Sequence, residues 1–333
     1  MATLLGGASR QTCASTFPPD SYYCLLDELP LHLVPRRNHR LLQLPDAEPL
    51  YLNPDCVILP ATECPNDFAP FPDLLAGFAK QGTVAWVRDA VSGSQLPFWL
   101  GPKLETIVRK LRRNEEAAPS IPQDARALLA GAGILISESR NRAQQIADAM
   151  TLEKAAALFA DKGYAPLVGL IHPFHVAALR RYYRYLIRSG AIQLGDRQSP
   201  RRYVAYNEAI ARFFHFQIAS ILSTIACERL KPSYVYMASY LSGAELRKHT
   251  DRPQCEFSIT FCLDFSPEPA LETPWPINLD TNGGTVTVYQ ALGDGLAYRG
   301  TRLPHYRSPL GEGQTSTSIF FHYVSHDFEG SLG

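Results

Sequence analysis

The sequence predicts an α+β protein in which a sandwich of antiparallel β-sheets is buttressed by helices. Three observations predict this class. The first part of the chain is rich in proline, the middle carries apolar residues at helical spacing, and the part after Pro232 breaks into short apolar segments separated by turns. Helices followed by many short strands are typical of an α+β sandwich. The same shift in character predicts an N-terminal accessory or recognition region over residues 1–140 and a main domain over residues 141–333.

The composition sets limits on partners and location. Hydrophobic residues make up 46% of the 333 residues, and charged residues make up 19% with a net charge of zero. This balance does not support nucleic acid or a membrane surface as a partner, and no stretch approaches the length and apolarity of a membrane span. Seven cysteines are scattered without a Cys-x-x-Cys pair, so we expect a cytoplasmic protein. The oligomeric state is not predicted.

In the first 140 residues the expected elements are short. Residues 54–59 and 83–87 favour strands, while residues 103–113 and 124–135 favour helices joined by a linker at 117–122. No catalytic pattern occurs in this region.

The middle of the chain predicts three helices and a strand. A helix capped by Thr151 is expected to end at Gly163, followed by a strand at 164–171. A second helix is expected from Pro173 to Gly190, and a long third one over residues 207–230. In the second helix, arginines at 180, 181, 184 and 188 offer a basic patch, but their spacing favours a solvated helix face. After Pro232, strands are expected at 234–241, 256–264, 285–290, 295–299 and 315–324.

Two imidazoles and one carboxylate form the strongest chemical pattern. His249 and Asp251 lie two apart, so on an extended segment their side chains point to the same side, and His305 follows 56 residues later (305 − 249). Two histidines and a carboxylate on one face of an ion leave its other face open, as non-haem iron(II) oxygenases require. A His-x-Asp triplet alone occurs often by chance, and an ordinary histidine is the alternative. The strands around these residues favour a metal site.

The same segments resemble a known family. Tyr240-Leu-Ser-Gly243 followed by His249-Thr-Asp251 looks like the Tyr-x-x-Gly…His-x-Asp signature of prolyl-4-hydroxylase-like 2-oxoglutarate oxygenases, and Gly293-Asp-Gly-Leu-Ala-Tyr298 resembles the strand that leads to their distal histidine. The resemblance covers about residues 160–325. It implies a double-stranded β-helix (jelly-roll) core, iron(II), and 2-oxoglutarate as co-substrate, which is decarboxylated to succinate while a C–H bond is hydroxylated.

The far carboxylate of 2-oxoglutarate needs a cation. Related enzymes often supply it about ten residues after the distal histidine, but residues 313–318 contain no basic residue. Arg307 is the expected replacement, because it lies two residues, or roughly 6–7 Å, after His305 on an extended segment. Arg299 and Arg302 are rivals. Tyr240 resembles the family's tyrosine that binds the co-substrate, and the expected hydroxyl contacts come from residues near the start of the last strand, namely Thr315, Ser316 and Ser318.

Other candidates are weaker. Trp275, in a proline-rich connection, and Arg252 are proposed substrate contacts, with a plain connecting loop as the equal alternative. Five other histidines are expected in packing, capping or surface positions: His172, His175, His215, His322 and His326. Cys255 and Cys262 lack a visible activating base and are not expected to act as nucleophiles.

The sequence therefore predicts an iron(II)/2-oxoglutarate-dependent dioxygenase that hydroxylates a small molecule, an amino acid or a peptide, free or carrier-bound. Two alternatives stay open. One is a non-catalytic binding or sensing module with the same fold, which the absent downstream basic residue favours. The other is a cupin-like metalloenzyme that binds iron but not 2-oxoglutarate.

Overall fold

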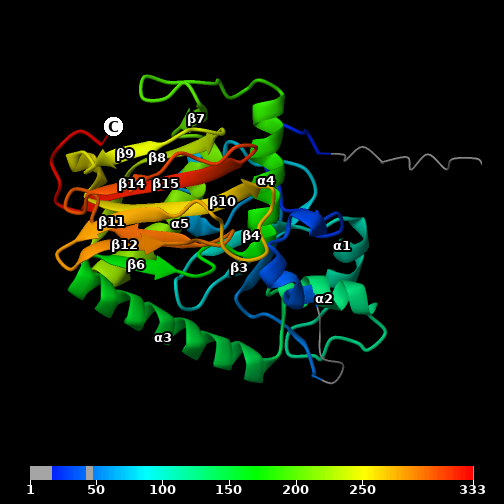
Figure 1. Cartoon of the computed structure of the whole chain (residues 1–333). Coiled ribbons are helices and arrows are strands. Elements are labelled where there is room, and N and C mark those ends of the chain that lie inside the picture. Colours follow the sequence, from blue (N-terminus) through cyan, green and yellow to red (C-terminus); the bar gives the residue numbers. More distant parts are fainter. Residues whose placement is uncertain (1–16, 43–47, 333) are drawn as a thin grey trace, which may run out of the picture.

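A computed structural model describes residues 17–42 and 48–332 (Figure 1). The chain mixes helices with several antiparallel sheets, as the sequence predicts. The largest sheet has six strands in the order β6-β13-β10-β15-β8-β7. Its strands are β6 (Tyr164–Leu167), β13 (Gly295–Tyr298), β10 (Phe257–Ser266), β15 (Thr315–Ser325), β8 (Leu230–Tyr240) and β7 (Arg202–Tyr206).

A second sheet of four strands has the order β12-β11-β14-β9. Its strands are β12 (Gly284–Val288), β11 (Ile277–Thr281), β14 (His305–Arg307) and β9 (Leu246–His249). Between β8 and β15 the chain passes repeatedly from one sheet to the other, so most neighbouring strands are distant in sequence, and β11 and β12 form a hairpin within the smaller sheet. Tyr298 of β13 contacts His305 of β14, which places the two sheets face to face.

Side chains of the large sheet alternate between two environments, as the two-residue period of a strand requires. On β10, Phe257, Ile259 and Phe261 join the main apolar core that includes the helices. The intervening Ser258 and Thr260 are also buried but face the smaller sheet, where Ser258 reaches Asp251. Buried polar groups that an apolar core would not select therefore line part of the space between the sheets, beside two small apolar clusters.

Three long helices cover the large sheet. They are α3 (Glu138–Lys162), α4 (Pro173–Arg188) and α5 (Ala209–Ala226). The expectation that Thr151 caps a helix is wrong: α3 begins 13 residues earlier (151 − 138), and the Thr151 hydroxyl donates to the Ala147 carbonyl within it. Gly163 ends α3 in the left-handed conformation as predicted, with φ of 77°.

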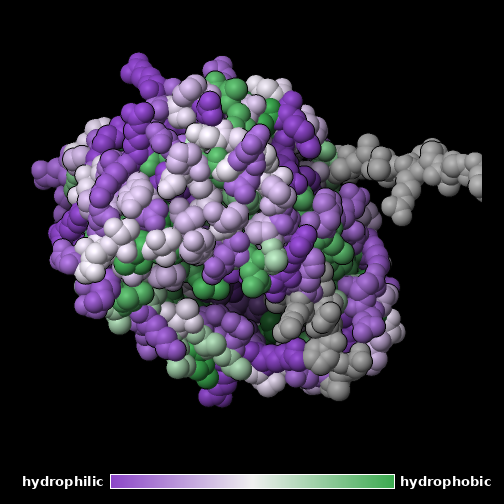
Figure 2. All heavy atoms as spheres, viewed as in Figure 1, coloured by the Kyte–Doolittle hydropathy of each residue, from purple (hydrophilic) through white to green (hydrophobic). Residues whose placement is uncertain are grey.

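The helix α5 corrects one statement made from the sequence. It is long and apolar enough to cross a membrane by length and composition alone, with a mean hydropathy of 1.3 over its 18 residues. Half of that stretch is buried inside the protein, where Phe213, Phe214 and Ile218 pack in the main core. The core helix of a globular protein can reach the same length and mean hydropathy. Hydrophilic residues predominate on the molecular face drawn in Figure 2.

The arginines of α4 also differ from expectation. Arg180 is buried and pairs with Asp264 and Glu268, while Arg184 also pairs with Asp264. The predicted solvated face is wrong for Arg180, which pairs with acidic side chains at the end of β10 and beyond it, whereas the Arg184 side chain is still 38% exposed. Arg181 lies over the Tyr23 ring, and Arg188 is exposed as predicted.

The N-terminal region packs against these helices. The Tyr22 hydroxyl lies 2.7 Å from Nδ1 of His175 on α4, and both residues are fully buried. The expected boundary between residues 140 and 141 falls in the first turn of α3. A separate role for residues 1–140 stays a prediction, and residues 1–16 and 43–47 lie outside the described part.

The elements of this region are short. They are β1 (Tyr51–Leu52), β2 (Cys56–Pro60), β3 (Thr83–Arg88), β4 (Gln95–Trp99), β5 (Leu135–Ile136), α1 (Pro102–Val108), α2 (Gln123–Gly131) and the 3-10 turns η1 (Leu31–Leu33), η2 (Arg36–Leu42), η3 (Asn66–Phe68) and η4 (Pro72–Leu75). A fifth 3-10 turn, η5 (Pro253–Cys255), follows Asp251. Strands β2 and β3 confirm the two strands expected here, and β4 was missed.

Candidate metal and co-substrate site

Two neighbouring strands of the smaller sheet bring the two histidines together. His249 is the last residue of β9 and His305 the first of β14, and they are direct partners in the antiparallel register. Their ring centroids lie 4.4 Å apart. The His305 side chain is 2% exposed and that of His249 is 40% exposed, so the pair reaches from the interior to the surface.

In both rings Nδ1 is held by a backbone carbonyl, and Nε2 of His305 also lies 3.5 Å from the Tyr298 hydroxyl. Nδ1 of His249 lies 2.7 Å from the Arg247 carbonyl oxygen, and Nδ1 of His305 lies 2.9 Å from that of Leu303. A carbonyl oxygen only accepts, so each Nδ1 carries the proton and each Nε2 keeps its lone pair. A backbone carbonyl bonded to the outer nitrogen is the usual support of a metal-binding histidine. Burial lowers the pKa of His305, which favours this neutral form.

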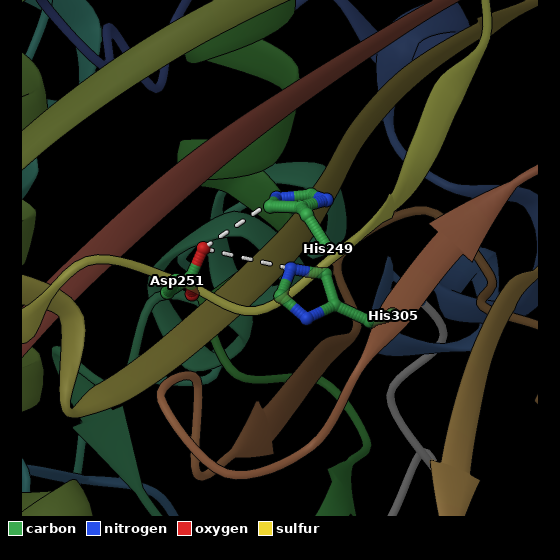
Figure 3. A group of neighbouring side chains, drawn as sticks. All are labelled: His249, Asp251 and His305. Carbon is green, nitrogen blue, oxygen red and sulfur yellow. Dashed lines mark ion pairs between the residues drawn. The ribbon is translucent and has the colours of Figure 1, made fainter.

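Asp251 completes the group from just beyond β9. Its Oδ1 lies 3.7 Å from Nε2 of His249 and 3.6 Å from Nε2 of His305, and Figure 3 shows both rings directed at this carboxylate. Its backbone N–H donates to the Gly300 carbonyl at 2.9 Å. An ion that binds each ligand at roughly 2 Å can bridge such separations. The structure thus brings together all three residues expected to hold a metal.

Gly300 is a member of the site that the sequence did not indicate. A Cβ there would collide with Asp251 Oδ2, with the Cys255 carbonyl oxygen and with the Ser258 hydroxyl. A glycine is needed because these atoms approach the backbone closely. The set of ligand atoms, the unprotonated Nε2 atoms and this close approach fit a bound divalent ion.

Arg307 lies in the interior beside the histidine pair. It is 6% exposed, and its guanidinium lies over the Trp275 ring at 4.7 Å. It donates to the Trp275 carbonyl oxygen at 2.5 Å and to Oε1 of Gln290 at 3.2 Å. Within residues 17–42 and 48–332, no acidic side chain forms an ion pair with it. A buried cation without a carboxylate partner is costly, and a bound anion removes that cost.

The rival arginines lie elsewhere. Arg299 is stacked on Phe159 and Phe257 at the α3 side of the large sheet, at 5.2 and 5.1 Å from their rings. Arg302 is exposed. Of the three candidates, only Arg307 is buried between the sheets.

Tyr240, Ser316 and Ser318 share the interior face with Arg307. All three are buried, and Ser316 pairs directly with Tyr240 across β15 and β8. Burial raises the pKa of Tyr240 despite the nearby positive charges of Arg202 and Arg307, so its hydroxyl stays a donor. Thr315 is different: it lines a pocket on the opposite face of the sheet, with Arg184. Strand alternation separates it from Ser316.

The two expected substrate contacts occupy different settings. Trp275 is 3% exposed and supports Arg307, while its indole N–H donates to the Ser308 carbonyl at 2.6 Å. Arg252 is exposed next to Asp251 and donates to the Tyr234 hydroxyl at 2.9 Å. Of the two, Arg252 is the one accessible from outside.

The other histidines sort by burial. His215 is a core residue bonded to the His322 carbonyl, as predicted, and His172 caps α4. His326 is exposed. His175 is buried, so its expected capping or surface placement is wrong, whereas the buried His322 agrees with the packing position expected for it. His322 also belongs to the site, because its Nδ1 lies 2.8 Å from the Ser258 hydroxyl, which bonds to Asp251.

Two interior cysteines are inert as nucleophiles. Burial raises the pKa values of Cys255 and Cys262 to about 12, so the thiolate is not available near neutral pH. No disulfide joins the cysteines of the described ranges; Cys13 lies outside them.

No protein-family model matches the sequence, and no curated protein matches it. Solved structures do resemble the chain over about half its length. The α-ketoglutarate-dependent epimerase SnoN from nogalamycin biosynthesis shares 14% identity and a TM-score of 0.45, covering 52% of this chain and 80% of its own. A prolyl-4-hydroxylase from Pseudomonas putida shares 17% identity and a TM-score of 0.42, covering 52% of this chain and 99% of its own.

A third such structure contains ligands. HygX from Streptomyces hygroscopicus, with nickel, 2-oxoglutarate and hygromycin B bound, shares 11% identity and a TM-score of 0.43, covering 53% of this chain and 88% of its own. The matched structures include members of the oxygenase superfamily that the sequence motifs resemble. With TM-scores below 0.5, these likenesses bear on neither the reaction nor the substrate of this chain.

Proposed function

We propose that this protein is an iron(II)- and 2-oxoglutarate-dependent dioxygenase that hydroxylates a C–H bond of a small molecule, an amino acid or a peptide. The observation that carries the proposal is the convergence of two Nε2 atoms and one carboxylate oxygen beside a buried arginine without an acidic partner among the described residues. The pattern of strands passing between the two sheets supports a double-stranded β-helix core.

Each residue has a specific task in this proposal. His249, Asp251 and His305 hold the iron on one side and leave its remaining positions for the co-substrate and oxygen. Arg307 binds the far carboxylate of 2-oxoglutarate, and Gln290 and Trp275 hold its guanidinium in place. Tyr240, Ser316 and Ser318 supply neutral hydroxyl groups nearby. When bound, the iron would activate O2, with one oxygen atom entering succinate as 2-oxoglutarate loses CO2 and the other entering the hydroxylated C–H bond.

Arg252 is the proposed substrate contact, because it is exposed and follows the metal ligand Asp251 directly. Its guanidinium is oriented by Tyr234. A polar or anionic substrate group is the natural partner of an exposed guanidinium. We also propose that the protein is located in the cytoplasm.

The proposal is tested by ordered binding followed by turnover. The wild-type protein is expected to bind Mn²⁺, then 2-oxoglutarate only in the presence of the metal, and to form succinate with ferrous iron and oxygen. His249→Ala and His305→Ala are expected to lose metal binding while staying folded. His326→Ala, which removes an exposed histidine outside the site, is the matched control. Absence of metal-dependent 2-oxoglutarate binding in the wild type would overturn the proposal. Binding without succinate would favour the sensing module.

A further inference from the structure

A buried hydrogen-bond chain runs from Asp251 across two strands of the large sheet. The Ser258 hydroxyl lies 2.9 Å from Asp251 Oδ2 and 2.8 Å from Nδ1 of His322. Ser258 of β10 and His322 of β15 are direct partners in the antiparallel register, and both are at least 97% buried. The pair therefore forms a fixed support behind the carboxylate.

The direction of each hydrogen bond follows from the groups involved. A carboxylate only accepts, so the single hydroxyl hydrogen of Ser258 points to Asp251. The serine oxygen then accepts from His322, which places the histidine proton on Nδ1. Nε2 of His322 is buried and has no partner in the described part of the chain. Among the described residues, the His322 imidazole is thus hydrogen-bonded to Ser258 alone.

From this geometry we infer that Ser258 and His322 are positioning residues that hold Asp251 as a ligand through one oxygen. The inference rests on the proposed function, since it concerns the same metal site. The Ser258 hydroxyl occupies Oδ2, so Oδ1 is the oxygen left to face the two histidines. A carboxylate binding through both oxygens would take an additional coordination position, which a bidentate co-substrate and oxygen require.

A second group of possible ligands shows what this support prevents. Ligand atoms of Asp251, Cys255 and His322 also lie within 4.8 Å of one another. If the Asp251 carboxylate turned away from His249 and His305, it would lie with Cys255 and His322 instead. Ser258 holds the carboxylate in the first arrangement. Its hydroxyl bonds to Asp251 and His322 and lies 3.3 Å from the Cys255 carbonyl oxygen.

The test compares Mn²⁺ affinity among variants of the full chain. Ser258→Ala and His322→Leu each break the hydrogen-bond chain to Asp251. Each is expected to weaken Mn²⁺ binding about 10- to 100-fold, the usual cost of losing a residue that supports a metal ligand. Ser258→Thr keeps the hydroxyl and His322→Asn keeps a donor in place of Nδ1–H. Both are expected to stay within about threefold of wild type.

Thr260→Val is the matched control. Thr260 lies two residues from Ser258 on the same face of β10, is fully buried, and its hydroxyl has no partner among the residues described. Its Mn²⁺ affinity is expected to be that of the wild type. The visible absorption of bound Co²⁺ provides a second readout, because it reports the number and geometry of ligands. It should change in Ser258→Ala and not in Thr260→Val.

The outcomes separate this inference from the proposed function. A wild type that binds neither Mn²⁺ nor Co²⁺ overturns both. A wild type that binds, with Ser258→Ala and His322→Leu folded and indistinguishable from it, overturns the positioning role alone. If Ser258→Ala does not fold, the comparison of His322→Leu with His322→Asn decides, and equal affinities refute the role.

Discussion

Replacing Arg307 with methionine separates a co-substrate anchor from a structural cation. Methionine keeps much of the volume and removes the charge. Loss of charge-assisted hydrogen bonds to a bound carboxylate costs about 2 kcal/mol, or roughly a 30-fold weaker affinity for 2-oxoglutarate. The unliganded protein should change little in stability, because relief of a buried charge offsets the loss of the two bonds to Trp275 and Gln290.

The assay is urea unfolding of the Mn²⁺-loaded protein with and without 2-oxoglutarate. At about 100 times the wild-type dissociation constant, the co-substrate should stabilise the wild type by about 2.7 kcal/mol. A 30-fold weaker affinity leaves a ratio of about 3, for which the stabilisation is only about 0.8 kcal/mol. Calorimetric titration measures the same affinity directly.

Arg302→Met is the matched control, since Arg302 is exposed in the same segment. It should keep the full stabilisation. The reasoning is refuted if Arg307→Met keeps the wild-type response to 2-oxoglutarate. It is also refuted if the unliganded variant loses 3–5 kcal/mol, which is about the cost of breaking a buried structural ion pair.

Three further perturbations test other parts of the structure. Gly300→Ala places a methyl group against the Asp251 carboxylate and should weaken Mn²⁺ binding at least tenfold, measured by equilibrium dialysis; wild-type affinity would show that the loop yields freely. Acidification should destabilise the fold, because burial lowers the pKa of His172 to about 4 and of His215 to about 3. The unfolded chain takes up these protons first, so stability present above about pH 6.5 falls toward pH 4, and a flat urea-midpoint profile over that range would contradict this. Arg180→Met should lower the unfolding free energy by about 1.5–3 kcal/mol, since it leaves the partly buried Glu268 without its cation and Asp264 with Arg184 alone; a loss under 1 kcal/mol would mean that water already screens these carboxylates.

The candidate metal ligands could be predicted because two of them lie close together in the sequence. His249 and Asp251 are two apart, and strands surround both them and His305. The sequence could not supply the register that makes His305 the direct partner of His249. The sequence treated His249 and Asp251 as parts of one extended segment and did not predict β9, which ends at His249, nor the hydrogen bond from the Asp251 N–H to the Gly300 carbonyl.

Errors along the helices share one cause, which is that local spacing does not reveal tertiary partners. The arginines of α4 repeat as on a solvated face, yet Asp264 and Glu268 lie more than 80 residues away in the sequence and bury Arg180. Thr151 has the residue type of a helix cap, but a hydroxyl within a helix is equally satisfied by the carbonyl four residues before it.

The alternation of apolar and polar residues along β10 is the sequence signal for the polar groups between the sheets. In 257–262, apolar residues at odd positions alternate with Ser258, Thr260 and Cys262, a pattern usually taken to mean a solvent-exposed face. Here the polar face is buried beneath a second sheet. Because burial of unpaired hydroxyl and imidazole groups costs free energy, a sandwich that places polar residues inside must gain something from them. In our proposals that gain is the orientation of Asp251 at Ser258 and His322, and the charge offered to a co-substrate at Arg307.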